Sequence, residues 1–206
     1  MRAIASPVGA LAALALLLTA AFAPSSSAGP AFHDLKEAHG CSFLISDPRE
    51  SGYHTLRAEC DWPKVAAARV ERVLVDLRGW DATFSHLSRS VVIKEDEGQP
   101  VVLRVGYTGK GFPDQSADLS VTQERRGETL VLSWTKAPQQ RADDLVIEID
   151  TGSFEVSPAP SGGTRLIFER SFEPTGGGVV AKSGETGATL RLIEELYLRA
   201  TSISAG

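Results

Sequence analysis

The sequence predicts an α+β fold in which a curved antiparallel sheet of about seven strands packs against one long C-terminal helix. Between residues 88 and 173, apolar residues recur with a period of two, and short turn-rich links separate the segments. Such links hold no crossover helix, so neighbouring strands must run antiparallel. The only long segment with helical periodicity, residues 176–204, then follows, and it is long enough to cover one face of the sheet.

The size and charge of the chain limit what it can be. Its 206 residues suit one ordinary domain, and 21 basic residues minus 26 acidic residues give a net charge of -5. No basic run occurs anywhere in the sequence. Nucleic-acid binders need a clustered positive surface, so nucleic acid is excluded as a partner.

The N-terminus has the composition of a secretory signal peptide. Arg2 precedes an apolar run over residues 8–22, and small residues follow up to Ala28. We predict a signal peptide over residues 1–28, and hence a periplasmic or extracellular protein. The alternative is a retained membrane anchor, for which the apolar run is short.

Export makes the two cysteines informative, because an oxidising compartment favours a disulfide between Cys41 and Cys60. The bond would tie residues 29–52, which we expect to be irregular, to the first strand, and would contribute about 3 kcal/mol. The alternative is a metal site formed by Cys41, His33 and His39. It lacks a second pair of closely spaced ligands, so we predict no metal.

The first strand is expected at residues 53–62, where apolar and polar side chains alternate. Pro63 suits the first turn of a helix, and Gly79 ends that helix before a second short helix or turn over residues 80–87. The apolar face of the first of these helices consists of Val70, Val73, Leu74 and Leu77. The two helices are therefore expected to form a corner.

The remaining strands are expected at residues 88–94, 100–108, 116–124, 129–136, 145–156 and 164–173. Gly127 marks a hairpin turn. The apolar positions change from odd to even numbers across Thr151 and Gly152, which predicts a β-bulge there.

This order of elements resembles the START-like, or SRPBCC, superfamily over residues 53–203. The most similar wording is residues 70–81, VERVLVDLRGWD, which looks like the first helix and the aspartate and aromatic corner of polyketide-cyclase and coenzyme-Q-binding relatives. The resemblance implies a helix-grip fold: one strand, two helices, six strands and a long helix. Members of the superfamily bind lipids, sterols, quinones, hormones or polyketides between sheet and helix, and a minority are enzymes.

The resemblance makes the inward faces of the strands and terminal helix candidate ligand-binding surfaces, although the same residues could fill a dry core. The candidates are Leu103, Val105, Tyr107, Leu119, Val121, Leu132, Trp134, Ile147, Phe154, Phe168, Arg170, Phe172, Leu190, Ile193 and Tyr197. Arg170 occupies an even-numbered position on its strand, as its apolar neighbours do, so its side chain is expected on the same face as theirs. It either points inward, which requires an anionic partner or a ligand head group, or is turned to solvent by a bulge. Arg104 and Arg165 alternate with the apolar residues of their strands, so they are expected to lie on the other face and to point to solvent.

Two further features of the sequence leave alternatives open. Gly184 and Gly187 indicate either a frayed helix that truly begins near Ala188 or a flexible lip that admits a ligand. His54 and His86 have no evident acid or base partner, so we expect them to be surface or capping residues.

We therefore predict an exported monomer that binds an apolar or amphipathic small molecule, such as a lipid, isoprenoid or polyketide-like compound. We predict no cofactor and no catalytic residue. A cyclase or hydrolase acting in the same cavity would need an inward acid-base pair, which the strand parities do not supply. An envelope interaction module without a ligand is a further alternative, and contact with a membrane surface stays open.

Overall fold

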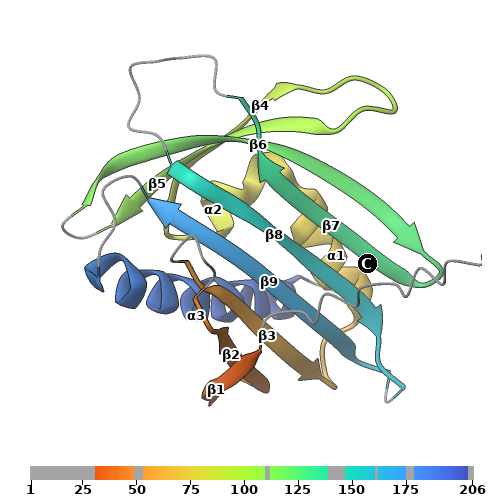
Figure 1. Cartoon of the computed structure of the whole chain (residues 1–206). Helices are drawn as coiled ribbons and strands as arrows, with labels where there is room; N and C mark the ends of the chain where they lie inside the picture. The colour runs from red at the N-terminus through yellow and green to blue at the C-terminus, as the bar shows by residue number, and fades with distance from the viewer. Residues whose placement is uncertain are drawn as a thin grey trace, which may run out of the picture.

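The computed structural model describes residues 31–48, 53–109, 112–138, 147–160, 162–174 and 179–203. Within these residues, nine antiparallel strands form one open, strongly curved sheet in the order β1-β2-β3-β9-β8-β7-β6-β5-β4 (Figure 1). The strands are β1 (Phe32–Ala38), β2 (Cys41–Ser46), β3 (Thr55–Trp62), β4 (Leu87–Lys94), β5 (Val101–Gly109), β6 (Phe112–Arg126), β7 (Thr129–Lys136), β8 (Ile147–Pro158) and β9 (Thr164–Pro174). The sheet thus has two strands more than predicted.

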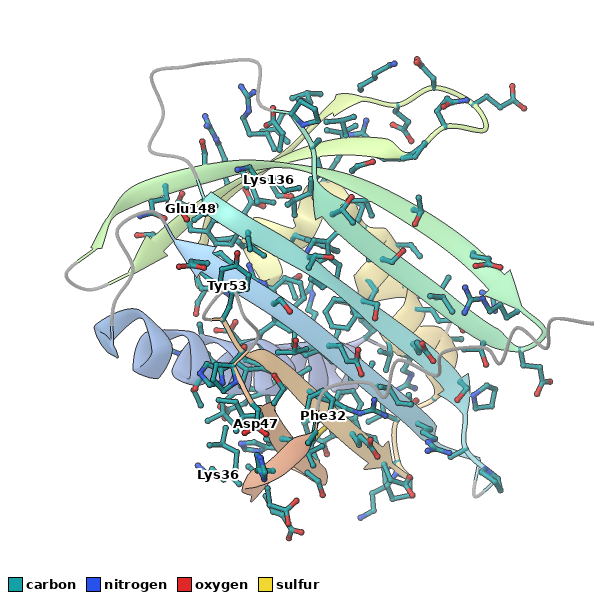
Figure 2. All side chains as sticks on the ribbon, in the orientation of Figure 1. Phe32, Lys36, Asp47, Tyr53, Lys136 and Glu148 are labelled. Atoms are coloured by element: carbon teal, nitrogen blue, oxygen red, sulfur yellow. A yellow bond between two sulfur atoms is a disulfide. The ribbon has the colours of Figure 1, made fainter. Side chains whose placement is uncertain are left out.

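The two additional strands form a hairpin within residues 29–52, where an irregular segment was wrongly expected. β1 pairs with β2, and β2 pairs with β3. The side chains of β1 are mostly exposed, so its sequence carries no alternation of apolar and polar residues. Phe32 packs against the sheet, with its ring 5.8 Å from the Arg57 guanidinium, whereas Lys36 extends away from it (Figure 2).

The predicted helical corner is present. α1 (Ala67–Val75) is followed by a 3-10 turn, η1 (Leu77–Gly79), and by α2 (Trp80–Thr83). The indole Nε1 of Trp80 donates a hydrogen bond of 3.0 Å to the Leu74 carbonyl, which fixes the angle of the corner.

α3 (Val179–Ser202) packs on the same face of the sheet as α1 and α2 (Figure 1). It includes Gly184 and Gly187, so the alternative in which the helix begins near Ala188 does not hold. Its buried face consists of Thr189, Leu192, Ile193, Leu196 and Ala200. No helix in the described ranges is both long and apolar enough to cross a membrane.

The predicted bulge lies elsewhere on β8. Pairing is continuous through Thr151 and Gly152, and the register shifts between Ile147 and Ile149. Because of this shift, the inward position after Ile147 is Asp150 rather than Ile149. A carboxylate therefore faces the interior from the middle of the sheet.

Candidate functional site

A cavity of about 20 Å³ lies between the sheet and the helices. It is lined by Trp80, Phe84, His86, Leu87, Val105, Tyr107, Leu119, Trp134, Phe154, Arg170 and Leu192. A volume of this size holds about one water molecule, whereas ligand pockets usually measure roughly 300–1,000 Å³. The lining side chains therefore nearly fill the interior.

Six of the predicted site residues line this cavity: Val105, Tyr107, Leu119, Trp134, Phe154 and Arg170. Six others are buried in the surrounding core: Leu103, Val121, Leu132, Ile147, Phe168 and Ile193. Phe172, Leu190 and Tyr197 are partly buried against that core. The prediction missed the lining residues of the helical corner, although Trp80, Phe84 and Leu87 have the spacing of one apolar face.

Arg170 points inward, and its anionic partner is Asp150. The guanidinium donates from Nε to Asp150 Oδ1 at 3.1 Å and from Nη2 to Oδ2 at 2.9 Å. The side chains of Arg170 and Asp150 are 6% and 0% exposed. Two charges this deeply buried are tolerated because each neutralises and hydrogen-bonds the other.

Two further side chains donate to Asp150. The Tyr107 hydroxyl donates to Asp150 Oδ2 and accepts a hydrogen bond of 3.0 Å from Arg170 Nη2. Trp134 Nε1 donates to Asp150 Oδ1 at 2.8 Å. Burial and the Asp150 charge raise the pKa of Tyr107 well above its usual value, so the phenol stays protonated. We call Tyr107, Trp134, Asp150 and Arg170 the polar cluster.

Gly152 makes the position of the Trp134 indole possible. It pairs with Trp134 on one side and with Arg170 on the other. A Cβ at this position would lie 2.5 Å from Trp134 Cζ2 and 2.5 Å from the Glu169 carbonyl oxygen. Only glycine lets the indole lie across β8, from where its N–H reaches Asp150.

His86, predicted to be a surface or capping residue, is half-buried. It lies in the turn between α2 and β4, lines the cavity and stacks on Tyr107, with ring centroids 6.2 Å apart. Burial, followed by the positive charges of Arg170 and Arg191, lowers its pKa to about 3. The imidazole is therefore neutral at physiological pH.

Arg104 differs from its predicted environment as well. It lies on the opposite face of the sheet from Leu103 and Val105, as its parity predicted, but it is not open to solvent. Its guanidinium donates to both carboxylate oxygens of Asp118, at 2.6 Å and 2.8 Å, and the two side chains are 14% and 0% exposed.

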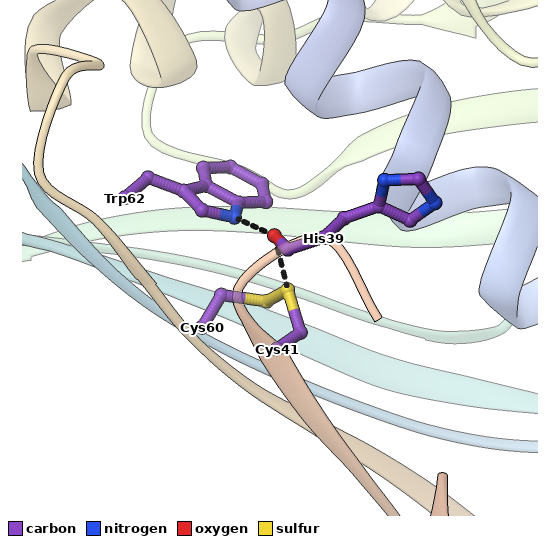
Figure 3. Close-up of a disulfide and its surroundings, with 4 residues drawn as sticks. All are labelled: His39, Cys41, Cys60 and Trp62. Atoms are coloured by element: carbon purple, nitrogen blue, oxygen red, sulfur yellow. Dashed lines mark hydrogen bonds between the residues drawn. A yellow bond between two sulfur atoms is a disulfide. The ribbon is translucent and has the colours of Figure 1, made fainter. Parts of the chain in front are cut away.

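The predicted disulfide joins Cys41 to Cys60, which are direct partners on β2 and β3 (Figure 3). It leaves no thiolate at Cys41 for the alternative metal site. The described residues contain no group of three or more side chains suited to a metal ion. In the hairpin turn, the His39 carbonyl accepts a hydrogen bond of 3.0 Å from Trp62 Nε1.

The hairpin also contacts the terminal helix. The His39 imidazole extends toward α3 (Figure 3), where its Nε2 lies 3.6 Å from a Glu194 carboxylate oxygen. The Tyr197 ring packs edge-on against Trp62, with centroids 5.3 Å apart. These contacts hold the C-terminal half of α3 against the sheet.

Neither a protein-family model nor a curated protein matches this sequence. Solved structures match it by fold. A STAR-related lipid transfer protein from Xanthomonas axonopodis has a TM-score of 0.71 and 17% identity, over 83% of this chain and 99% of that one. Human StAR-related lipid transfer protein 5 has a TM-score of 0.69 and 14% identity, over 86% and 88%.

A START superfamily protein from Mycobacterium smegmatis gives a TM-score of 0.57 at 13% identity, over 74% of this chain and all of the other. Identities this low establish a common fold rather than a common activity. The chain therefore has the START-like, helix-grip fold that its sequence predicted.

Proposed function

We propose that this chain is an exported protein that binds an apolar or amphipathic small molecule, of the lipid, isoprenoid or polyketide type, between the sheet and α3. The observation that carries the proposal is the composition of the cavity wall, which is aromatic and aliphatic except for Arg170 and His86. Such a wall is typical of pockets that hold an apolar body and orient it by a few polar groups. The names of the lipid transfer proteins with this fold support the same class of ligand.

Ligand binding must enlarge the cavity, since about 20 Å³ cannot hold a lipid. Leu192, near the middle of α3, lines the cavity, whereas Trp62 and His39 hold the helix further along, at Tyr197 and Glu194. We propose that the N-terminal half moves instead. Gly184 and Gly187 each lower its helix propensity by about 1 kcal/mol relative to alanine. Amide hydrogen exchange in this half as slow as in the strands would contradict the movement.

The geometry favours binding over catalysis. The carboxylate of Asp150 accepts hydrogen bonds from Tyr107, Trp134 and Arg170, so its lone pairs are occupied. A histidine with a pKa of about 3, such as His86, is a weak base at neutral pH. A cyclase or hydrolase would need one of these groups free to transfer a proton.

Binding is tested by native mass spectrometry of protein purified from its own host, followed by extraction of bound small molecules. A matched pair of variants on α3 locates the site. Leu192→Trp would fill the cavity and should abolish ligand retention, whereas Leu198→Trp, at a position 56% exposed, should leave it unchanged. Wild-type protein that is reproducibly empty would contradict the proposal, as would full ligand retention by folded Leu192→Trp protein.

Export is tested separately by cell fractionation and N-terminal sequencing of the mature chain. Residues 1–28 lie outside the described residues, so this part of the proposal rests on their composition and on the Cys41–Cys60 disulfide. We expect a mature chain that begins at Gly29. An intact Met1 in protein recovered from the cytoplasm would contradict it.

A further inference from the structure

His86 is held rigidly at the wall of the cavity. Its carbonyl accepts a hydrogen bond of 3.0 Å from the Thr108 amide, which ties the turn to β5. Its ring lies between Phe84 and Tyr107, with centroid distances of 6.1 Å and 6.2 Å. The imidazole therefore has a fixed orientation beside the polar cluster.

The Nδ1 atom of His86 is buried and has no hydrogen-bond partner among the described residues. Leaving a buried polar atom unsatisfied is unfavourable, and native proteins rarely do so unless a ligand or an ordered water completes the bond. The structure offers a second such atom on α3. Thr189 Oγ1 is buried, with no hydrogen-bond partner in the described part of the chain, one helical turn before Leu192 and Ile193.

The charges of the cavity wall are already balanced. Arg170 is paired through two hydrogen bonds with Asp150, and His86 is neutral because its pKa is low. Arg191, the other cation that acts on His86, is exposed to solvent on α3. An anionic head group inside the cavity would thus be desolvated without a buried counter-ion, which is strongly unfavourable.

We propose that the cavity selects apolar molecules that carry one uncharged oxygen function, a hydroxyl or a carbonyl, which hydrogen-bonds to His86 Nδ1. This inference rests on the proposed function and specifies its ligand class. Tyr107, which the polar cluster holds in place, stacks on the His86 ring. The aromatic residues around them contact the apolar body. A hydroxyl can donate to Nδ1 or accept from it, whereas a carbonyl can only accept, so the two groups report which tautomer is present.

The test compares four probes of equal chain length: a long-chain alcohol, the methyl ketone, the carboxylate and the alkane. Binding is followed by intrinsic tryptophan fluorescence, because Trp80 and Trp134 line the cavity. We expect the alcohol or the ketone to bind about tenfold more tightly than the alkane, the effect of one additional hydrogen bond, and the carboxylate to bind most weakly.

Two variants assign the preference to His86. His86→Phe retains an aromatic ring beside Tyr107 but removes Nδ1, and it should abolish the tenfold preference for the alcohol or ketone over the alkane. His86→Asn places an amide near the position of Nδ1 and should restore part of the preference. Thermal unfolding of the ligand-free proteins is the independent readout. His86→Phe should be at least as stable as wild type, because it removes an unsatisfied buried atom.

The outcomes separate the inference from the proposed function. If wild-type protein binds none of the four probes, both fail. If it binds the alkane as tightly as the alcohol and the ketone, or prefers the carboxylate, the function stands and this inference is overturned. Equal losses for all probes in His86→Phe would also overturn it, since the ring would then have a structural role alone.

Discussion

Two buried arginine–aspartate pairs on opposite faces of the sheet have the same geometry and different surroundings. Arg104 and Asp118 are direct cross-strand partners on β5 and β6, and they lie on the face away from the helices. Arg170 and Asp150 join β9 to β8 on the other face, where Arg170 lines the cavity. In both pairs, the guanidinium donates two hydrogen bonds to the carboxylate.

The difference lies in what else each carboxylate does. In the described part of the chain, the carboxylate of Asp118 accepts hydrogen bonds from Arg104 only, whereas that of Asp150 also accepts them from Tyr107 and Trp134. The outer pair therefore links two neighbouring strands. The inner pair organises side chains from β5, β7, β8 and β9 into the wall of a cavity, so the same chemistry serves stability in one place and a candidate binding site in the other.

The largest expected difference between the pairs comes from removing each negative charge. Asp150→Asn should destabilise the protein by about 3–5 kcal/mol, because it leaves a buried guanidinium unpaired and three donors with a weaker acceptor. Asp118→Asn should cost less, about 1–3 kcal/mol, because Arg104 is partly exposed and can be hydrated. Urea unfolding of both variants measures the two losses of stability. A larger loss for Asp118→Asn would contradict the claim that the inner carboxylate organises more of the structure than the outer one.

Replacing both members of a pair by apolar residues separates the effect of the ion pair from that of the other hydrogen bonds to its carboxylate. Arg104→Met with Asp118→Leu should be close to neutral, since it removes both desolvation penalties together. Arg170→Met with Asp150→Leu should still cost about 2–4 kcal/mol, because the Tyr107 hydroxyl and Trp134 N–H lose their acceptor. Equal unfolding free energies for the two double variants would show that the inner pair has no organising role.

Acidification should affect the inner region through His86. Its pKa in the folded protein, about 3, lies below the value of 6.5 for an unperturbed histidine, so the unfolded chain binds the proton first as the pH falls. Ionisation of His86 costs the folded protein no stability above about pH 6.5, and the cost grows progressively as the pH falls toward 3. This amounts to about 2 kcal/mol between pH 7 and pH 5.

His86→Phe should reduce that pH dependence by the same amount, and unfolding free energies measured at pH 7 and pH 5 provide the check. Replacement of the exposed His33 by glutamine serves as the control variant. If His86→Phe and wild type lose equal stability between the two pH values, the imidazole is not held neutral at the cavity wall.

Among the single substitutions in the two pairs and their neighbours, the smallest expected loss of stability is that of the Tyr107 hydroxyl. Tyr107→Phe removes one donor to Asp150 and one acceptor for Arg170 while the ring keeps its contacts, so it should cost about 1 kcal/mol. Tyr197→Phe is the matched control, because that ring packs against Trp62 through its edge and stays in place. A loss above that of Asp150→Asn would mean that Tyr107, rather than the carboxylate, organises the cluster.

Much of the fold could be predicted because local patterns report which face of an element is buried. The alternation over β3 and the apolar face of α1 placed both elements correctly. β1 escaped prediction because an edge strand with exposed side chains has no such pattern. The alternation gave a wrong prediction on β8, because the register shift near Ile149 places Asp150 on the inward face.

By itself, the sequence determined the order of the elements from β3 onward, the helical corner, the disulfide and the strand that carries Arg170. Only the tertiary structure decided that Tyr107, Arg170 and His86 meet at one cavity, and that Asp150 joins the first two of them. The reason is physical. Periodicity records the burial of apolar side chains along one element, whereas contacts between β5 and β9, which are not neighbours in the sheet, depend on its curvature and on the register of every strand between them.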